Sequence, residues 1–172
     1  MSKVFGKTER YQLINTQGNR TIVSYGIERV DEVNSTWHEV DFPKAHGEKP
    51  SIEQVKKAII ADIDAETQKA IIEGFVWNGK PVWLSIENQA NFTAAEHRAQ
   101  TDEDYLPRQM KIGEDGDGAA VYHTFKKPET LTAFLNACLD YIEQCRTAGW
   151  EKKDSFDFTE YETVLKNDTL QP

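Results

Sequence analysis

The sequence contains few of the residues from which enzymes and metal proteins are usually recognised. Its 172 residues include two cysteines and four histidines. The histidines share no metal-ligand spacing with one another or with a cysteine, and Glu96-His97 lacks the second histidine of a zinc-protease helix. A Gly-x-Ser-x-Gly motif and a glycine-rich phosphate loop are also missing. From these absences we expect no catalytic residue, no metal ion and no cofactor.

Positive charge and long apolar runs are scarce as well. Lys and Arg number 20 against 29 Asp and Glu, which gives a net charge of −9. Because nucleic-acid phosphates attract Lys and Arg patches, this balance disfavours nucleic acid as a partner. No run approaches the roughly 18 apolar residues of a membrane span, and residues 1–7 lack the apolar core of a signal peptide. We therefore expect a cytoplasmic protein with no membrane partner.

The two cysteines, Cys138 and Cys145, lie seven residues apart in a strongly helical stretch. Two helical turns separate their Cα atoms by about 10.5 Å, which is beyond the reach of a disulfide. Both cysteines also fit an apolar stripe of the same stretch. We therefore interpret them as reduced core cysteines rather than as a redox pair.

What the sequence does contain is enough apolar and aromatic material for a folded domain. Hydrophobic residues make up 38% of the chain, and there are four Trp, six Tyr and eight Phe. This content argues against intrinsic disorder. The predicted fold class is α+β. We expect an N-terminal antiparallel β-meander, then helices and a hairpin–helix–hairpin–helix unit with antiparallel sheet.

The order of these patterns divides the chain into four predicted segments. They are a β-meander at residues 1–42, a linker at 43–50, an α+β domain at 51–158 and a partly disordered tail at 159–172. Within the meander we expect three strands, at residues 11–16, 22–27 and 37–42, the last with the two-residue alternation of a half-buried strand. His38 and His123 both fall in predicted strands, and we interpret them as sheet residues rather than catalytic groups.

The predicted helices are marked by their capping residues. Ser51 and Gln54 form a capping box at the start of the first helix. Asp64 is expected to cap a second, short helix that ends at Gly74. Ser85 is expected to cap a helix that runs to about Gln100. One face of that helix is expected to hold Ile86, Ala90, Ala94 and His97.

Two hairpins and a long helix complete the predicted domain. Asn78-Gly79 lies between two β-rich arms and predicts a type I′ turn, because that turn needs positive φ at both central positions. A second hairpin is expected over residues 106–125. The final helix is expected to start at Pro128 and to end at Gly149, with Trp150 packing back on its last turn. Its apolar stripe comprises Leu131, Phe134, Leu135, Cys138, Ile142 and Cys145.

Two tryptophans of the first hairpin are the candidate binding residues. The register of the type I′ turn pairs Trp77 with Lys80 and places Trp83 opposite residue 74, so the two indoles fall on opposite faces. One tryptophan is then free to lie outward as a platform for a ligand or partner. The competing interpretation is that each packs under a neighbouring helix. Trp77 and Trp83 form the predicted binding surface.

The segment from Gly74 to Phe92, with the sequence GFVWNGKPVWLSIENQANF, resembles a family of small prophage-encoded proteins. That family is a domain of unknown function found in bacterial and phage genomes, often beside tail or tail-fibre genes. The resemblance extends from about Ile52 to Phe158 and includes Ala148–Asp154. The family has no established catalytic residues, so the resemblance implies none here.

The resemblance implies a non-enzymatic prophage protein, either a minor tail component or an assembly partner of a tail fibre, acting by protein–protein contact. Its partners would be other phage structural or assembly proteins. It would be cytoplasmic, with incorporation into phage particles as an option. A ligand-binding module for carbohydrate, using an exposed Trp77 or Trp83, is the alternative, and a small enzyme comes third. No heptad or collagen-like repeat imposes a trimer, so we expect a monomer or a weak dimer.

Overall fold

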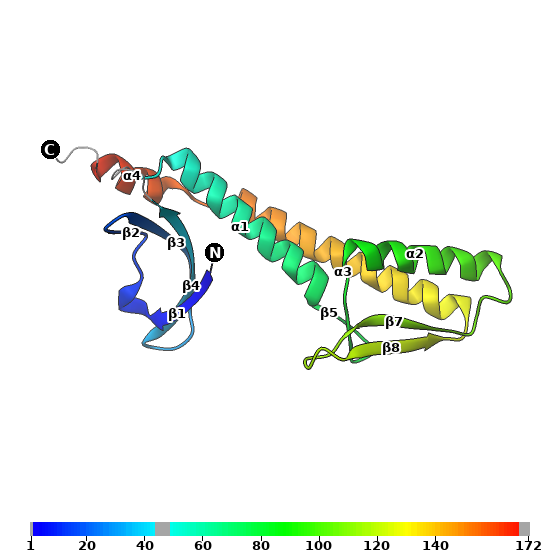
Figure 1. The fold of residues 1–172 in the computed structure, drawn as a ribbon. Coiled ribbons are helices and arrows are strands. Elements are labelled where there is room, and N and C mark those ends of the chain that lie inside the picture. The colour runs from blue at the N-terminus through cyan, green and yellow to red at the C-terminus, as the bar shows by residue number, and fades with distance from the viewer. Residues whose placement is uncertain (1, 44–48, 169–172) are drawn as a thin grey trace. The chain divides into compact units, whose positions relative to one another are not determined.

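The computed structural model describes residues 2–43 and 49–168 and confirms the α+β class (Figure 1). Residues 44–48 of the predicted linker lie outside this description. Two compact units divide the chain. The sheet unit comprises Met1–Ile63 and Lys153–Pro172, and the hairpin unit comprises Asp64–Lys152. The division expected from the sequence, with boundaries after residues 42, 50 and 158, stays a prediction, because compactness alone does not define a folding domain.

The sheet unit contains a four-stranded antiparallel sheet with the strand order β1-β4-β3-β2. Its strands are β1 (Ser2–Lys7), β2 (Ile14–Gln17), β3 (Arg20–Arg29) and β4 (Asn34–Pro43). The three strands of the predicted meander are present as β2, β3 and β4. Strand β1 was not expected. It pairs with the first part of β4, in a register that places Val4 opposite Trp37.

Gly6 explains why β1 is hard to recognise from the sequence. Glycine weakens a strand pattern, yet here a Cβ atom would lie 2.9 Å from the ring of Trp37. The missing side chain lets the backbone of β1 approach the indole. The residue that lowers the strand propensity is therefore the one that the tertiary contact requires.

One side of this sheet forms the core of the sheet unit. Buried side chains of β3 and β4 pack with buried side chains of helix α1 (Ile52–Glu73) and helix α4 (Thr159–Asp168). The buried set is Val23, Tyr25, Val40, Val55, Ile59, Ile63 and Tyr161. The predicted capping box holds at the start of α1, where the Ser51 N–H donates to Gln54 Oε1 at 2.8 Å and the Gln54 N–H donates to Ser51 Oγ at 3.2 Å.

Helix α1 differs from the expectation at Asp64, which lies inside one continuous helix rather than at the start of a second one. Asp is a good cap, but a cap acts only where the chain enters a helix from an extended conformation. No Gly or Pro interrupts Ile52–Glu73, so nothing in the backbone ends the first helix before Asp64.

Residues 159–168, assigned to the tail by the sequence analysis, form α4 in the structure. Two contacts hold this helix within the sheet unit. The buried Tyr161 hydroxyl donates to the Ser24 carbonyl oxygen at 2.9 Å. Lys56 Nζ lies 2.9 Å from Glu162 Oε1, and its ammonium also lies over the Phe158 ring. Only one or two side chains of α4 reach the core. The rest of its sequence is mostly polar, so the helix could not be recognised from an apolar pattern.

The hairpin unit contains the second part of α1 and then the predicted hairpin. Strands β5 (Phe75–Trp77) and β6 (Lys80–Val82) pair in the expected register, Phe75↔Val82 and Trp77↔Lys80. Asn78 has φ 49° and Gly79 has φ 73°, the positive values of a type I′ turn. Helix α2 (Ile86–Thr101) follows its predicted cap, because Ser85 Oγ accepts the Asn88 N–H at 3.2 Å.

The buried face of α2 is not the face that was predicted to hold Ile86, Ala90, Ala94 and His97. Ile86 is exposed, and the residues that face the core are Phe92, Ala95 and Ala99. Alanines occur on several faces of this helix, so their spacing alone did not distinguish the core face. Phe92 decides the orientation, because its ring buries the largest apolar surface of the helix.

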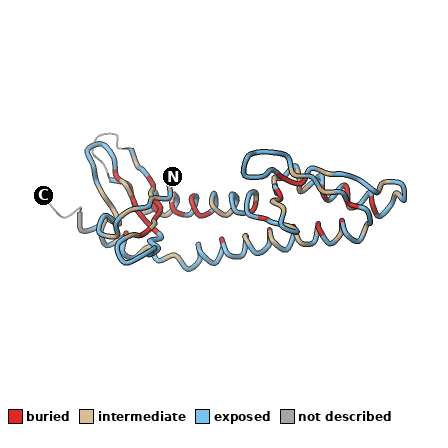
Figure 2. The backbone as a smooth tube through the Cα atoms, turned by 90° about the horizontal axis from the view of Figure 1, so that it is seen from below, coloured by how far each residue is buried: buried red, intermediate tan, exposed pale blue. Residues whose placement is uncertain are grey.

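The second hairpin and the long helix complete the unit. Strands β7 (Arg108–Glu114) and β8 (Ala120–Phe125) form the predicted antiparallel pair, and α3 spans Pro128–Asp154. The buried residues of α2, of α3 and of the strands form one core, and red segments mark these positions in Figure 2. Leu131, Phe134, Cys138 and Ile142 confirm the predicted stripe of α3.

Helix α3 does not end at Gly149, and Trp150 is an exposed helical residue rather than a cap contact. Gly149 is buried, and a Cβ atom there would lie 2.4 Å from Thr67 Oγ1 on α1. The glycine therefore permits a close helix–helix approach, not a helix end. Both cysteines are free, as expected, with Cys138 buried and Cys145 half-buried. In the described part of the chain, no helix is both long and apolar enough to cross a membrane.

Candidate binding surfaces of the hairpin unit

The structure places the two candidate tryptophans in different environments. Trp77 is half-buried, and its ring packs edge-on against His123 at 4.8 Å and against Phe134 at 4.9 Å between centroids. Trp83 follows β6 and is 40% exposed. Its backbone N–H donates to the Ile112 carbonyl oxygen at 2.9 Å, which fixes the position of the residue while its indole lies outward. Trp77 thus belongs to the core, and Trp83 is the accessible member of the pair.

A small pocket of about 210 Å³ adjoins Trp83. Three carboxylates contribute to its lining, from Glu73, Glu114 and Asp115. The Asp115 carboxylate already accepts the N–H groups of Asp117 and Ala119, which orders the turn beneath it. The pocket therefore combines one accessible indole with several hydrogen-bond acceptors.

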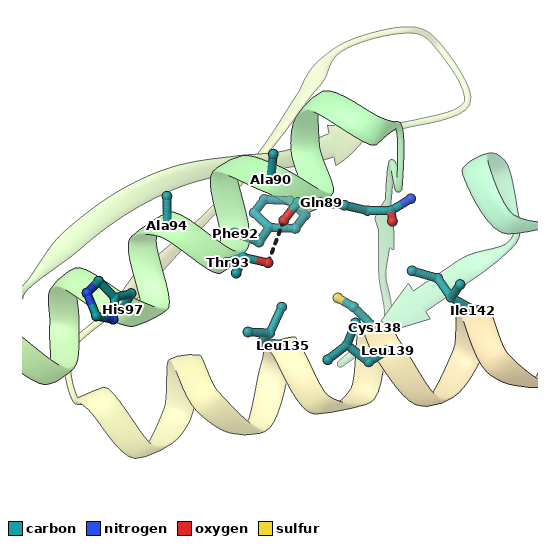
Figure 3. Close-up of a pocket in the computed structure, with 10 residues that line it drawn as sticks. All are labelled: Gln89, Ala90, Phe92, Thr93, Ala94, His97, Leu135, Cys138, Leu139 and Ile142. Atoms are coloured by element: carbon teal, nitrogen blue, oxygen red, sulfur yellow. Dashed lines mark hydrogen bonds between the residues drawn. The ribbon is translucent and has the colours of Figure 1, made fainter.

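A largely apolar groove of the hairpin unit lies between α2 and α3 (Figure 3). Its volume is about 470 Å³. Helix α2 contributes Gln89, Ala90, Phe92, Thr93, Ala94 and His97, and helix α3 contributes Leu135, Cys138, Leu139 and Ile142. Three of the four residues expected on one face of α2 thus line this groove rather than the protein core.

The Thr93 hydroxyl and the Gln89 amide N–H of this groove are already bonded to nearby backbone oxygens. The Thr93 hydroxyl donates to the Gln89 carbonyl oxygen at 2.9 Å, the dashed line in Figure 3. The Gln89 side-chain amide donates to the Leu84 carbonyl oxygen at 2.7 Å. Leu139 is 52% exposed although it is a large apolar side chain. The groove therefore presents apolar surface to solvent, with His97 as its ionisable rim residue.

Cys138 is a free, buried cysteine at the base of the groove. Burial raises the pKa of its thiol to about 12, because the apolar surroundings disfavour the charged form. A nucleophilic cysteine needs a lowered pKa and a thiolate at neutral pH. Cys138 therefore acts as a small apolar residue of the helix interface.

A buried polar cluster in the sheet unit joins β3, β4 and α1. The Tyr25 hydroxyl donates to Asp62 Oδ2 at 2.5 Å, and His38 Nδ1 lies 3.5 Å from the same oxygen. The Tyr25 and His38 rings stack at 5.1 Å. All three side chains are almost fully enclosed, so a substrate would not reach them, and we assign the cluster a structural role. The sequence analysis did not single out Asp62, whose position in an apolar helical stretch was the available signal.

His123 also lies in a strand, as predicted, and packs among aromatic rings. Burial lowers its pKa below the ordinary range, and the nearby Lys80 ammonium acts in the same direction. The imidazole contacts Trp77 and Phe125. In residues 2–43 and 49–168, no group of three or more His, Cys, Asp or Glu side chains is arranged to hold a metal ion.

The fold and these surfaces define an α+β protein whose second unit carries an apolar groove and an accessible tryptophan. Residues 54–168 match the family described as a domain of unknown function, DUF4376. The match spans most of the chain, so the protein belongs to this family. It confirms the domain of unknown function that the resemblance implied over about Ile52 to Phe158, and the matched range continues through α4. Comparison with curated proteins and with solved structures gives no match.

Proposed function

We propose that the protein is a non-enzymatic, prophage-derived component of the phage tail or an assembly partner of a tail fibre, and that it acts by protein–protein contact. The groove between α2 and α3 carries this proposal. Its polar groups are used locally, and Leu139 exposes apolar surface that a partner would bury. A groove of this kind suits the apolar face of an amphipathic helix.

An exposed carboxylate beside the groove favours a partner helix with basic residues. Glu143 lies one helical turn after Leu139 on the same side of α3. Its side chain is exposed. The net charge of −9 acts in the same direction over longer range. The proposed partner therefore presents a Leu- or Phe-rich helix face flanked by Lys or Arg, carried by another phage structural or assembly protein.

Mass spectrometry of induced lysates tests the assignment to phage assembly. Purified particles are compared with the particle-free lysate of the same culture. Peptides of this protein at fixed stoichiometry in the particles identify a virion component, and peptides only in the lysate fraction that co-purify with one tail protein identify an assembly factor. Absence of any association with a phage protein contradicts the proposal.

A matched pair of variants tests the groove. Leu139→Gln and Trp150→Gln each replace a large, about half-exposed apolar side chain of the same helix. We expect Leu139→Gln to weaken the partner interaction by tenfold or more, because a buried apolar contact is replaced by an unpaired amide. Trp150→Gln, outside the groove, is expected to leave it unchanged. Equal effects of the two variants would remove the groove from the proposal.

The exposed Trp83 supports a second candidate function, a carbohydrate-binding module. Sugars stack on an accessible indole while their hydroxyls donate to carboxylates, and both kinds of group adjoin the 210 Å³ pocket. Glycan titration should then quench tryptophan fluorescence, and Trp83→Ala should abolish the response. Trp150→Ala, which removes another exposed tryptophan, should retain it. Quenching that survives Trp83→Ala contradicts this function.

A further inference from the structure

A second groove of the hairpin unit runs along strand β7, and it shares Phe92 and Ala94 with the groove between α2 and α3. Its volume is about 420 Å³, within the usual range of ligand sites. Helix α2 lines one wall, and the consecutive residues Arg108, Gln109, Met110 and Lys111 line the other. Successive side chains of a strand point to opposite faces. A groove that touches four consecutive residues therefore lies along the edge of the strand, where the backbone is accessible.

This edge of β7 is open. The backbone of Arg108–Lys111 pairs with β8 on the other side, through registers from Arg108↔Phe125 to Lys111↔Tyr122. No residue of β8 lines the groove. Farther along β7 the Trp83 N–H reaches the Ile112 carbonyl oxygen, and no backbone group in the described residues pairs with the edge before that point. An unpaired edge is a template for a further strand.

Positive charge gathers around the open edge. The guanidinium groups of Arg98 and Arg108 lie 4.8 Å and 4.9 Å from the centroid of the Tyr105 ring. Arg98 also pairs with Asp102 at 3.5 Å, an exposed contact that a competing carboxylate replaces at little cost. Arg108 pairs with no carboxylate among the residues that the structure describes. It is thus a free cation held in place by an aromatic ring.

Amide side chains complete the walls. Asn88 and Asn91 of α2 and Gln109 of β7 line the groove. The Asn88 amide donates to the Trp83 carbonyl oxygen at 2.8 Å, which leaves its own oxygen as an acceptor. The floor is apolar, formed by Phe92, Ala94 and Ala95. Such a groove combines backbone donors and acceptors, side-chain amides and a guanidinium within a protein whose overall charge is negative.

We propose that the edge of β7 binds an extended acidic segment of a partner protein by strand addition. The partner backbone would pair with Arg108–Lys111, and its alternate carboxylates would reach Arg108 and displace Asp102 from Arg98. Strand addition supplies affinity through main-chain hydrogen bonds, and side-chain charge sets the specificity. This inference rests on the open edge of β7 rather than on the groove between α2 and α3.

Fluorescence anisotropy with labelled octapeptides tests the charge requirement. The probe is an octapeptide of alternating Thr and Asp, and the control is the matched octapeptide of Thr and Lys. We expect binding of the acidic peptide alone, weakened by salt. Arg108→Gln should weaken binding about tenfold, the effect of losing one charge-assisted hydrogen bond. Arg146→Gln removes an exposed arginine of α3 outside the groove and should leave affinity within twofold.

Backbone methylation of the acidic peptide tests strand addition itself. Only every second N–H of an added strand faces its neighbour. One peptide is N-methylated at its Asp residues and the other at its Thr residues. We expect one of them to lose binding and the other to retain it. Equal affinity of both methylated peptides would show charge attraction alone and overturn the proposal.

Two further outcomes also overturn it. No binding of the acidic octapeptide to a folded protein at low salt rejects the site. A stable dimer in light scattering that Arg108→Gln leaves intact and that excludes the peptide would assign this edge to a second copy of the chain. The Arg108→Gln variant must keep the melting temperature within a few degrees, and Arg108→Lys, which retains the charge, should recover most of the affinity.

Discussion

Gly149 has a different role in the structure from the one that its position in the sequence indicates. Near the end of a helical pattern a glycine indicates a helix end, yet here it lies inside α3 against Thr67. The contact belongs to a neighbouring helix, and local sequence carries no sign of it. This is why the capping role assigned to Gly149 and Trp150 was wrong.

The stability of Gly149→Ala tests this explanation. In an ordinary helix interior this change stabilises by roughly 0.5–1 kcal/mol. Here the new methyl group would overlap the β-branched Thr67, and we expect a net destabilisation of about 1–2 kcal/mol. Urea unfolding measures the difference. Gly116→Ala is the control, since a Cβ at Gly116 meets nothing within 4 Å. A more stable Gly149→Ala protein would contradict the packing account.

Cys138 gives a second prediction at this scale. Because burial raises its thiol pKa to about 12, Ellman's reagent should label Cys138 in a Cys145→Ser protein only slowly at pH 8. Urea should release fast labelling, since the unfolded thiol returns to a pKa near 8.5. Fast labelling of the native protein would show that the groove base is open to solvent.

The lowered pKa of His123 predicts how the stability of the protein changes with pH. Its pKa is lowered in the folded protein, mainly by burial, whereas the unfolded residue has a pKa of about 6.5. As the pH falls below about 6.5, the unfolded state therefore takes up a proton more readily than the folded state. Stability should fall with the pH in this window. His123→Gln should reduce the slope of melting temperature against pH, and an unchanged slope would contradict the assignment.

At the scale of elements, the sequence predicted correctly those turns and helix starts whose backbone conformation is set by the local residues. Asn78-Gly79 requires positive φ values, and Ser85 offers a cap oxygen, so the turn register and the start of α2 were confirmed. Strand β1 and helix α4 depend on distant partners, Trp37 and Ser24. Their own sequences are short and polar, so their packing could not be predicted.

Helix α4 supplies the prediction at this scale. Tyr161→Phe removes the hydroxyl that donates to the buried Ser24 carbonyl oxygen at 2.9 Å, and we expect a loss of about 1–2 kcal/mol. Tyr11→Phe is the matched control, because the Tyr11 hydroxyl reaches the same oxygen at 3.5 Å, too far for a strong bond. Urea unfolding should therefore show the smaller effect for Tyr11→Phe. Equal effects would contradict a specific role of Tyr161.

For the whole molecule, composition and pattern predicted the α+β class, and the resemblance of Gly74–Phe92 indicated a domain of unknown function. They also named Trp83, which is 40% exposed. They did not reveal the groove between α2 and α3 or the open edge of β7. Each is formed by residues far apart in the sequence, and the spacing that placed Ala90, Ala94 and His97 on one face of α2 did not show what that face adjoins. The monomeric or weakly dimeric state and the prophage context stay predictions.

Site-specific photo-crosslinking from position 139 tests the central claim most directly. A benzophenone amino acid replaces Leu139 in the groove, and a second protein carries it at Trp150 on the same helix. On prophage induction we predict one discrete adduct from position 139, with a basic amphipathic helix of a phage structural or assembly protein, and none of that adduct from position 150. The same adducts from both positions, or no phage protein crosslinked from position 139, would contradict the proposal.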